Sequence, residues 1–185
     1  MNLSFLKDRS FIRELLVIAI PISFQQLINA SLNMIDVIMV GQLGETSIAA
    51  LGLSNQIFFV LILILFGATS GMSIFTAQFW GKQEIEPIRK VLGMSLILSI
   101  SVAFIFTLAA TLMPEIILGL YTKDAEVIRL GSSYLRIVGF TYIPIAIATS
   151  YIAILRSIQL VRLTVVATVS ALIFKTILGY MLIFG

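Results

Sequence analysis

Two ionisable side chains lie inside long apolar stretches of this sequence. Lys175 stands in the middle of the stretch 163–184, and Asp36 stands near the end of the stretch 14–39. A charged lysine at the centre of a bilayer costs about 2.5–3.5 kcal/mol, and such residues mark ion pathways and proton relays. Lys175 is therefore paired with a carboxylate, neutral, or set in a hydrated cavity. Asp36 is its natural partner. Counted from the outer ends of the two stretches, Asp36 lies about 5 Å deep and Lys175 about 15 Å deep, so a direct contact between them stays open.

Polar side chains form a wall on the first apolar stretch. Gln25, Asn29, Asn33 and Asp36 lie within a sector of about 80° when they are placed on a helix. This pattern predicts a wall that faces a cavity. The alternative is that these side chains join helices by interhelical hydrogen bonds and that Asp36 reaches interfacial water.

One face of the stretch 47–80 mixes small polar side chains with aromatic and aliphatic ones. Its members are Asn55, Phe59, Ile62, Phe66, Thr69 and Ser73. Such a face suits an adaptable pocket for amphiphilic organic molecules. Helix packing is the alternative, because Gly67 and Gly71 have the spacing of small residues that lets helices approach closely.

Two later stretches add candidates for the same cavity. Tyr142 and Thr149 share one helical face, and Lys175 shares another with Gly179. We expect these residues to line a cavity together with Asn55 and the polar wall. We expect Arg136 to extend toward the outer interface or to bind a carbonyl, and not to touch a substrate.

The composition identifies the class of protein that must hold these side chains. Of the 185 residues, 59% are hydrophobic and 11% are charged, and the mean hydropathy is +1.11. A soluble domain has about 45–50% apolar and about 25% charged residues, so we expect an all-α membrane protein. The expected spans, in a single helical bundle over residues 1–185, are 14–39, 47–80, 88–113, 128–156 and 163–184. The mixed segment 114–127 suits a short helix at the interface.

The basic residues predict the orientation of these spans. Those on the amino-terminal side are Lys7, Arg9, Arg13, Lys82, Arg89, Lys90, Arg156 and Arg162. The other side holds only Lys123 and Arg129. This bias predicts a multi-pass protein of the cell membrane with a cytoplasmic amino terminus. The net charge of +3 then reflects this topology and contact with the headgroups of the lipid bilayer, and it predicts no nucleic-acid partner.

The residue types also exclude several kinds of chemistry. The chain has no cysteine and no histidine, which leaves no disulfide, thiolate nucleophile, zinc site or catalytic triad. It has no phosphate-binding loop, dinucleotide fingerprint or hydrolase motif. We therefore predict that it is not an enzyme and that it has neither a metal site nor an organic cofactor.

Short motifs follow one another along the chain. They are Pro21 with Gln25-Gln26, Met34-Ile35-Asp36-Val37-Ile38-Met39-Val40-Gly41, Ile48-Ala49-Ala50-Leu51-Gly52, Ala77-Gln78-Phe79-Trp80-Gly81, Leu155-Arg156-Ser157 and Tyr180-Met181-Leu182-Ile183-Phe184-Gly185. In this order and spacing they resemble the multidrug and toxic compound extrusion (MATE) family, over essentially the whole chain.

The resemblance implies a secondary active antiporter that exports cationic or amphiphilic drugs or metabolites. Exchange for protons or sodium ions drives such export, and two six-helix lobes give alternating access. By motif, Asp36 matches the acid that couples the cation in the family. Pro21 then offers the hinge at which the first helix bends.

Two positions depart from the family pattern. Lys175 and Gly179 stand where the family usually has Asn, or an acid in some branches. A fixed positive charge competes with a sodium ion, so the sequence favours proton coupling, with Asp36 and Lys175 as the coupling residues.

The length is a further departure. Five expected helices are one short of a six-helix lobe, so we expect a fragment of such a transporter, an incomplete amino-terminal lobe that lacks the carboxyl-terminal helices needed for transport. Two alternatives stay open. One is a flippase for lipid-linked precursors, which Lys175 and Arg136 favour, and the other is a truncated membrane remnant that transports nothing.

Overall fold

The structure is a computed structural model, and it describes most of the chain. It covers residues 44–184, with side chains up to residue 174, and before them residues 12, 13, 16, 19, 20, 22–24, 26–28, 30, 31, 34, 37 and 41. The chain separates into two compact units, residues 37–159 and residues 1–36 with 160–185. Each unit is described by itself, and the single bundle expected over residues 1–185 stays a prediction.

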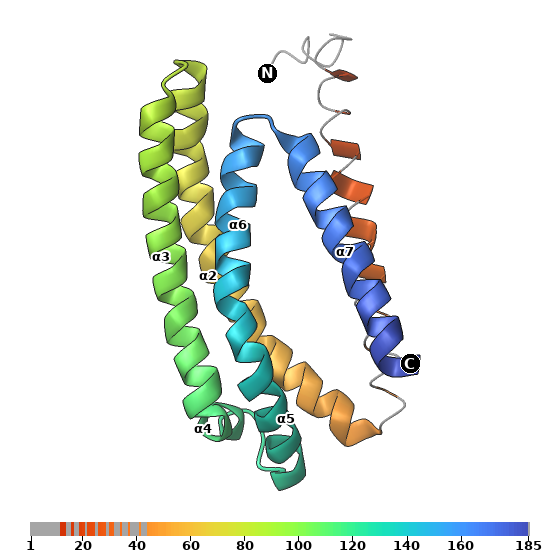
Figure 1. The fold of residues 1–185 in the computed structure, drawn as a ribbon. Coiled ribbons are helices and arrows are strands. Elements are labelled where there is room, and N and C mark those ends of the chain that lie inside the picture. The colour runs from red at the N-terminus through yellow and green to blue at the C-terminus, as the bar shows by residue number, and fades with distance from the viewer. Residues whose placement is uncertain are drawn as a thin grey trace, which may run out of the picture. The chain divides into compact units, whose positions relative to one another are not determined.

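The described residues 44–184 form helices joined by short turns and contain no strand (Figure 1). The elements are α2 (Glu45–Gly81), α3 (Ile85–Leu112), α4 (Pro114–Gly119), α5 (Ala125–Val138), the 3₁₀ turn η2 (Gly139–Thr141), α6 (Tyr142–Ser157) and α7 (Val161–Phe184). Three segments of the described part are long and apolar enough to cross a membrane, namely α2, α3 and the run Ala125–Ser157. The prediction of an all-α membrane protein is confirmed. Half of the residues in the expected span 14–39 lie outside the described residues.

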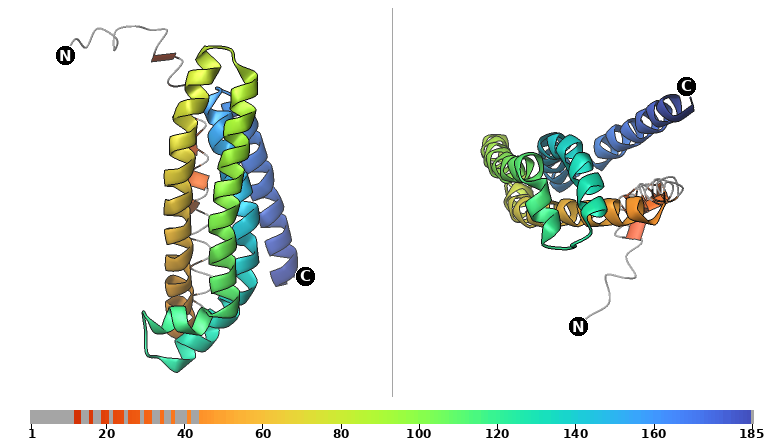
Figure 2. Two further views of the ribbon diagram at one scale, coloured as in Figure 1. Left: turned by 90° about the vertical axis from the view of Figure 1, so that its left-hand side faces the viewer. Right: turned by 90° about the horizontal axis from the view of Figure 1, so that it is seen from below.

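The unit of residues 37–159 is built from helices that run lengthwise beside one another. α2 packs against α3, α5 and α6, and α3 packs against α6. Figure 2 shows α2 and α3 side by side, with α4 and α5 at the end opposite the α2–α3 turn. α2 and α6 run in the same direction, from the end where α4 and α5 lie toward the end with the α2–α3 turn (Figure 1).

Two glutamines in the left-handed conformation end helices in this unit. Gln83 has φ 61°, and its N–H donates to the carbonyl of Trp80 at 3.0 Å. Gln159 has φ 63°, and its N–H donates to the carbonyl of Arg156 at 3.1 Å. Glycine is the usual residue at this position. The glutamines close α2 and α6 in its place and satisfy carbonyls at the helix ends.

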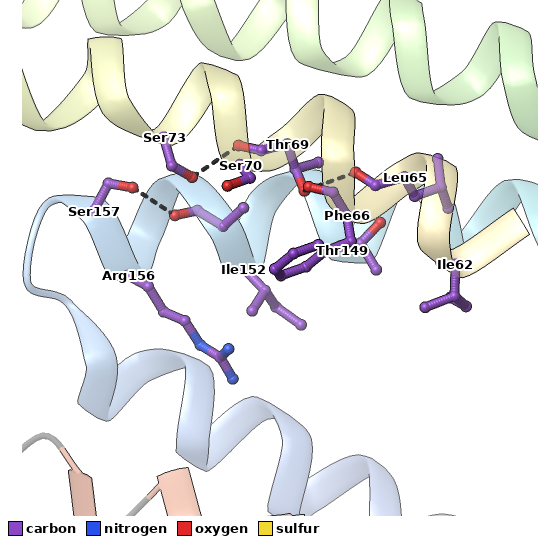
Figure 3. Close-up of a pocket in the computed structure, with 11 residues that line it drawn as sticks. Ile62, Leu65, Phe66, Thr69, Ser70, Ser73, Thr149, Ile152, Arg156 and Ser157 are labelled. Atoms are coloured by element: carbon purple, nitrogen blue, oxygen red, sulfur yellow. Dashed lines mark hydrogen bonds between the residues drawn. The ribbon is translucent and has the colours of Figure 1, made fainter. Parts of the chain in front are cut away.

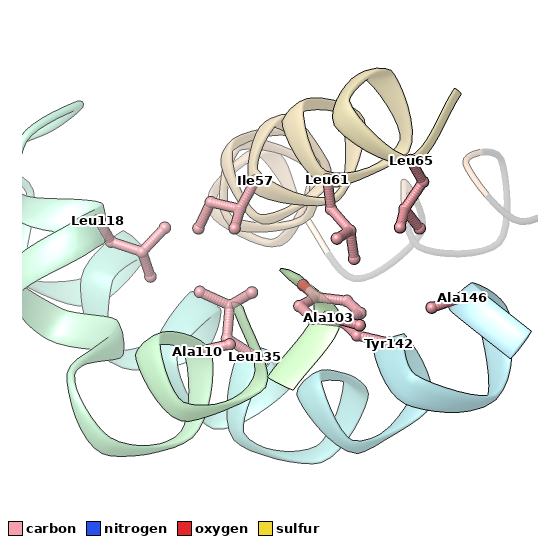
Figure 4. Close-up of a cluster of buried hydrophobic side chains, with 9 residues drawn as sticks. All are labelled: Ile57, Leu61, Leu65, Ala103, Ala110, Leu118, Leu135, Tyr142 and Ala146. Atoms are coloured by element: carbon pink, nitrogen blue, oxygen red, sulfur yellow. The ribbon is translucent and has the colours of Figure 1, made fainter. Parts of the chain in front are cut away.

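The core lies where α2, α3, α4, α5 and α6 converge (Figure 4). Its buried side chains are Ile57, Leu61, Leu65, Ala103, Ala110, Leu118, Leu135, Tyr142 and Ala146. The α3 side of this core consists of small residues, and Ser150 of α6 donates a hydrogen bond to Ser99 of α3 at 3.0 Å. Lipid tails are as apolar as leucine, so close packing and such hydrogen bonds hold membrane helices together.

A 3₁₀ turn interrupts the span that covers the predicted stretch 128–156. Pro144 follows this turn and has no N–H to donate to the carbonyl of Phe140. The hydroxyl of Thr107 on α3 donates to the buried carbonyl of Gly139 at 2.9 Å. This carbonyl also accepts from the N–H of Tyr142, so α3 adds a second hydrogen bond at the break.

The mixed segment 114–127 divides between two helices. α4 ends at Gly119, and the side chain of Asp124 caps α5 by accepting from the N–H groups of Glu126 and Val127. An ion pair joins the two helices, with Arg136 donating to Glu115 at 3.0 Å. The partner of Arg136 is therefore the carboxylate of Glu115 in place of the expected carbonyl, and its extension toward the outer interface stays a prediction.

Gly139 should be intolerant of any side chain. A Cβ atom placed there would lie 3.1 Å from the Cβ of Ala110 and 3.3 Å from the Cγ2 of Thr111. We expect Gly139→Ala to lower the stability of the folded protein by about 1–3 kcal/mol through overpacking. Thermal unfolding in detergent, followed by circular dichroism, measures the change.

Gly93→Ala is the matched control. No atom lies within 4 Å of a Cβ built at Gly93 in α3, and alanine is favoured over glycine in a helix by about 0.5–1 kcal/mol. The control should unfold at the wild-type temperature or above it. Equal effects of the two substitutions would contradict the close approach at Gly139.

Candidate functional site

A cavity of about 470 Å³ lies between α2 and α6 within the unit of residues 37–159. Its lining residues are Ile62, Leu65, Phe66, Thr69, Ser70, Ser73, Thr149, Ile152, Ala153, Arg156 and Ser157. Figure 3 shows these side chains along two neighbouring helices, with Ser73 and Ser157 at one end and Ile62 at the other. The volume is within the range of about 300–1,000 Å³ that holds small organic molecules.

Helical spacing brings these residues onto facing walls. Ile62, Phe66, Thr69 and Ser73 recur at intervals of three and four along α2. On α6, the interval of seven between Thr149 and Arg156 corresponds to two turns. Small side chains such as Ser73, Ala153 and Ser157 leave the space open where larger ones would fill it.

One part of the wall is apolar. Ile62, Phe66 and Ile152 present aliphatic and aromatic surface, and Phe66 is well exposed in this unit. The ring of Phe66 lies next to Ile152 in Figure 3. This surface can take up the apolar body of a ligand.

The hydroxyl groups of Ser73, Thr149 and Ser157 in the wall each donate a hydrogen bond to a carbonyl of their own helix. Ser73 donates to the carbonyl of Thr69 at 2.9 Å, Thr149 to that of Ile145 at 2.9 Å, and Ser157 to that of Ala153 at 2.9 Å. A hydroxyl has one donor and two acceptor lone pairs. What these groups offer the cavity is therefore acceptors, which suit N–H donors of a ligand.

Arg156 is the charged residue among those that line the cavity, and no acidic side chain of the described chain lines it. It sits in the last turn of α6, and its side chain extends on the same side of the helix as Ile152 (Figure 3). From the sequence, Arg156 is a topology signal and part of the motif Leu155-Arg156-Ser157, and no place in a cavity is predicted for it. Its position seven residues after Thr149 was the signal that could have placed it on the cavity wall.

The structure places three of the predicted cavity residues, Thr149, Tyr142 and Asn55, in different surroundings. Thr149 lies on the cavity wall. Tyr142 lies in the core at 0% exposure, with its ring stacked on Phe58 at a centroid distance of 6.0 Å. Asn55 is exposed on α2, about two turns before Ile62, and is not part of the lining. Substrate binding by these three residues stays a prediction.

The remaining predicted site residues lie outside what the structure describes. Pro21, Gln25, Asn29, Asn33 and Asp36 are not among the described residues. Lys175 and Gly179 belong to α7, beyond the last described side chain. The polar wall, the pairing of Asp36 with Lys175 and the hinge stay predictions. Among the described side chains, no group of three acids forms a metal site.

Comparisons with known proteins identify relatives of this chain. The family model MatE matches residues 21–181. A probable multidrug resistance protein NorM from Rhizobium meliloti is 30% identical over 94% of this chain and 37% of its own length. A protein of the same description from Agrobacterium fabrum is 26% identical over 95% of this chain and 38% of its own. One from Bacillus subtilis is 25% identical over 96% and 39%. The chain thus spans less than two fifths of the length of these relatives.

A tryptophan in the cavity should prevent binding. Ile152→Trp fills the space beside Phe66, so we expect it to weaken binding of a rhodamine methyl ester about tenfold or more. Fluorescence polarisation of the dye with the purified protein measures the affinity. Ile147→Trp, at an exposed position of α6 outside the lining, is the matched control and should bind as the wild type does. Equal affinity of both variants would show that the dye binds elsewhere.

Proposed function

Because this chain belongs to the MATE family, we propose that it serves in a secondary transporter that exports small amphiphilic organic compounds across the cell membrane. It is a multi-pass membrane protein by its helices. The relatives it matches are described as multidrug resistance proteins. The chain covers 37–39% of their length, so the complete activity is proposed for the protein in which this chain acts.

The observation that carries this proposal is the cavity between α2 and α6. It joins apolar surface at Ile62 and Phe66 to hydroxyl acceptors at Ser73 and Thr149 within segments that cross the membrane. Side chains of this kind bind compounds that share an apolar body and a few polar atoms, without demanding one shape. Such a site suits the export of several compounds.

We propose that Asp36 couples export to the ion gradient. A charged carboxylate without a partner costs free energy in an apolar segment. Binding of a proton or a cation removes this cost. Lys175 in the fifth expected span would compete with a sodium ion, which favours the proton. Pro21, which cannot donate a helical hydrogen bond, supplies a point where the first segment can bend on protonation. The gradient drives transport in this proposal without a cofactor.

Removal of the acid should abolish export. In cells that express the complete protein containing this chain, we expect Asp36→Asn to reduce efflux of a rhodamine methyl ester to the level of cells without that protein, because the amide cannot take up a proton. Loss of dye fluorescence from preloaded cells measures efflux. Glu84→Gln, which removes one negative charge in the α2–α3 turn, is the control and should export normally. Undiminished efflux by the Asp36→Asn protein would remove Asp36 from the mechanism.

Membrane vesicles prepared from the same cells test which ion drives transport. Everted membrane vesicles with an imposed proton gradient should accumulate the dye, and a sodium gradient of equal size should not replace it. Accumulation driven by sodium alone would contradict proton coupling.

The orientation can be tested because the chain has no cysteine. Lys123 and Lys82 are both exposed, and they lie at opposite ends of the helices of one unit. With the amino terminus in the cytoplasm, a membrane-impermeant maleimide should label Lys123→Cys in intact cells and Lys82→Cys only after permeabilisation. Both variants lose one positive charge, so each controls the other. The reverse labelling pattern would invert the proposed topology.

A further inference from the structure

The cavity between α2 and α6 changes in chemistry along its length. Ile62 on α2 marks one end, and Ser73, about 16 Å further along the helix, marks the other. Arg156 and Ser157 lie in the last turn of α6 and belong to the polar end. A ligand that spans the cavity therefore meets an apolar end and a cationic end.

The two kinds of polar group in the wall bind opposite kinds of hydrogen-bonding partner. Ser73 and Thr149 offer acceptors, since their protons bond carbonyls of their own helices. Arg156 offers donors only. A guanidinium has five N–H groups in a planar fork, which fits the two oxygens of a carboxylate or phosphate and leaves donors over for a protein partner.

The charge of the wall discriminates between classes of amphiphile. No acidic residue of the described chain lines the cavity. A ligand with positive charge alone would meet the guanidinium of Arg156 as a like charge. A ligand that also carries an acid group gains a charge-assisted hydrogen bond to that guanidinium. The acid group then sets the direction in which the ligand lies.

We infer that this cavity binds amphiphiles that carry an acid group, with that group at Arg156, any N–H donor near Ser73 and Thr149, and the apolar body against Phe66 and Ile62. The inference rests on the proposed export function and names the class of compound that the same site prefers. The shared chemistry is an anionic group on an apolar body, whether a small-molecule acid or a phospholipid headgroup supplies it.

A pair of dyes tests this preference. A rhodamine with a free benzoic acid and the methyl ester of the same rhodamine differ in one acid group. With the complete purified protein in phosphatidylcholine nanodiscs, the acid should bind about tenfold more tightly than the ester. Arg156→Gln should remove this difference by weakening the acid, with the ester unchanged within about twofold.

Three further variants separate the roles in the cavity. Arg89→Gln makes the same change of charge at an exposed position of α3 outside the lining, and it should keep the full preference. Arg156→Lys keeps the charge but loses the planar fork, so it should keep part of the preference. Phe66→Ala should weaken both dyes by the same factor, because both have the same apolar body.

The outcomes separate this inference from the proposed function. Equal affinity of the two dyes for the wild type, or an equal effect of Arg89→Gln and Arg156→Gln, overturns the inference, and Asp36-dependent export of the ester would still stand. If Arg156→Gln yields no folded protein, the wild-type comparison and the Arg156→Lys variant decide in the same way. A retained acid preference together with export that does not depend on Asp36 overturns the proposed coupling alone.

Phosphatidylglycerol in the nanodiscs identifies the source of the acid group. Competition with the acid dye in the wild type, but not in Arg156→Gln, assigns the site to lipid headgroups. Unchanged dye binding assigns it to small-molecule acids. Both outcomes support an anionic group at Arg156.

Discussion

The structure depends on one constraint: a polar group in hydrocarbon must find its partner within the protein. Helices meet this requirement for the backbone, and the described part of the chain consists of helices and short turns. Where the span Ala125–Ser157 breaks at η2, the carbonyl of Gly139 accepts from the N–H of Tyr142 and also from the hydroxyl of Thr107 on α3. The hydroxyls of Ser73, Thr149 and Ser157 likewise donate to carbonyls one turn back.

The same constraint shapes the packing. Without a hydrophobic force between helices in lipid, close contact has to come from small side chains. Ala103 and Ala110 on α3 and Ala146 on α6 let these helices approach in the core. Along α2 and α6 the small residues Ser73, Ala153 and Ser157 border a cavity. Small residues therefore allow close packing in one place and leave a cavity open in another. Which of the two occurs depends on whether the facing helix converges or diverges there.

The described part of the chain contains the cavity that we propose as the binding site, and the predicted coupling acid lies outside the described part. The cavity holds apolar, hydroxyl and guanidinium groups in separate positions, as a site for amphiphiles requires. Asp36 and Lys175 are the expected means by which an ion gradient acts on that site. In a two-lobe exporter, ion binding and substrate binding are coupled through the helices that carry them, because each ligand shifts the same conformational equilibrium.

The sequence by itself determined the helical membrane class and the mixed face of α2 with Phe66, Thr69 and Ser73. It also indicated long helices between Glu45 and Phe184, but neither the break at η2 nor the division of the segment 114–127 between α4 and α5. Hydropathy and helical periodicity are local properties, so a sequence shows them directly. Only the tertiary structure decided that Tyr142 enters the core although Thr149, on the same face of α6, borders the cavity. It also paired Arg136 with Glu115 and Thr107 with Gly139, and it placed Arg156 on a cavity wall. These contacts join residues on different helices, and they depend on where the helices converge and diverge, which no local pattern records.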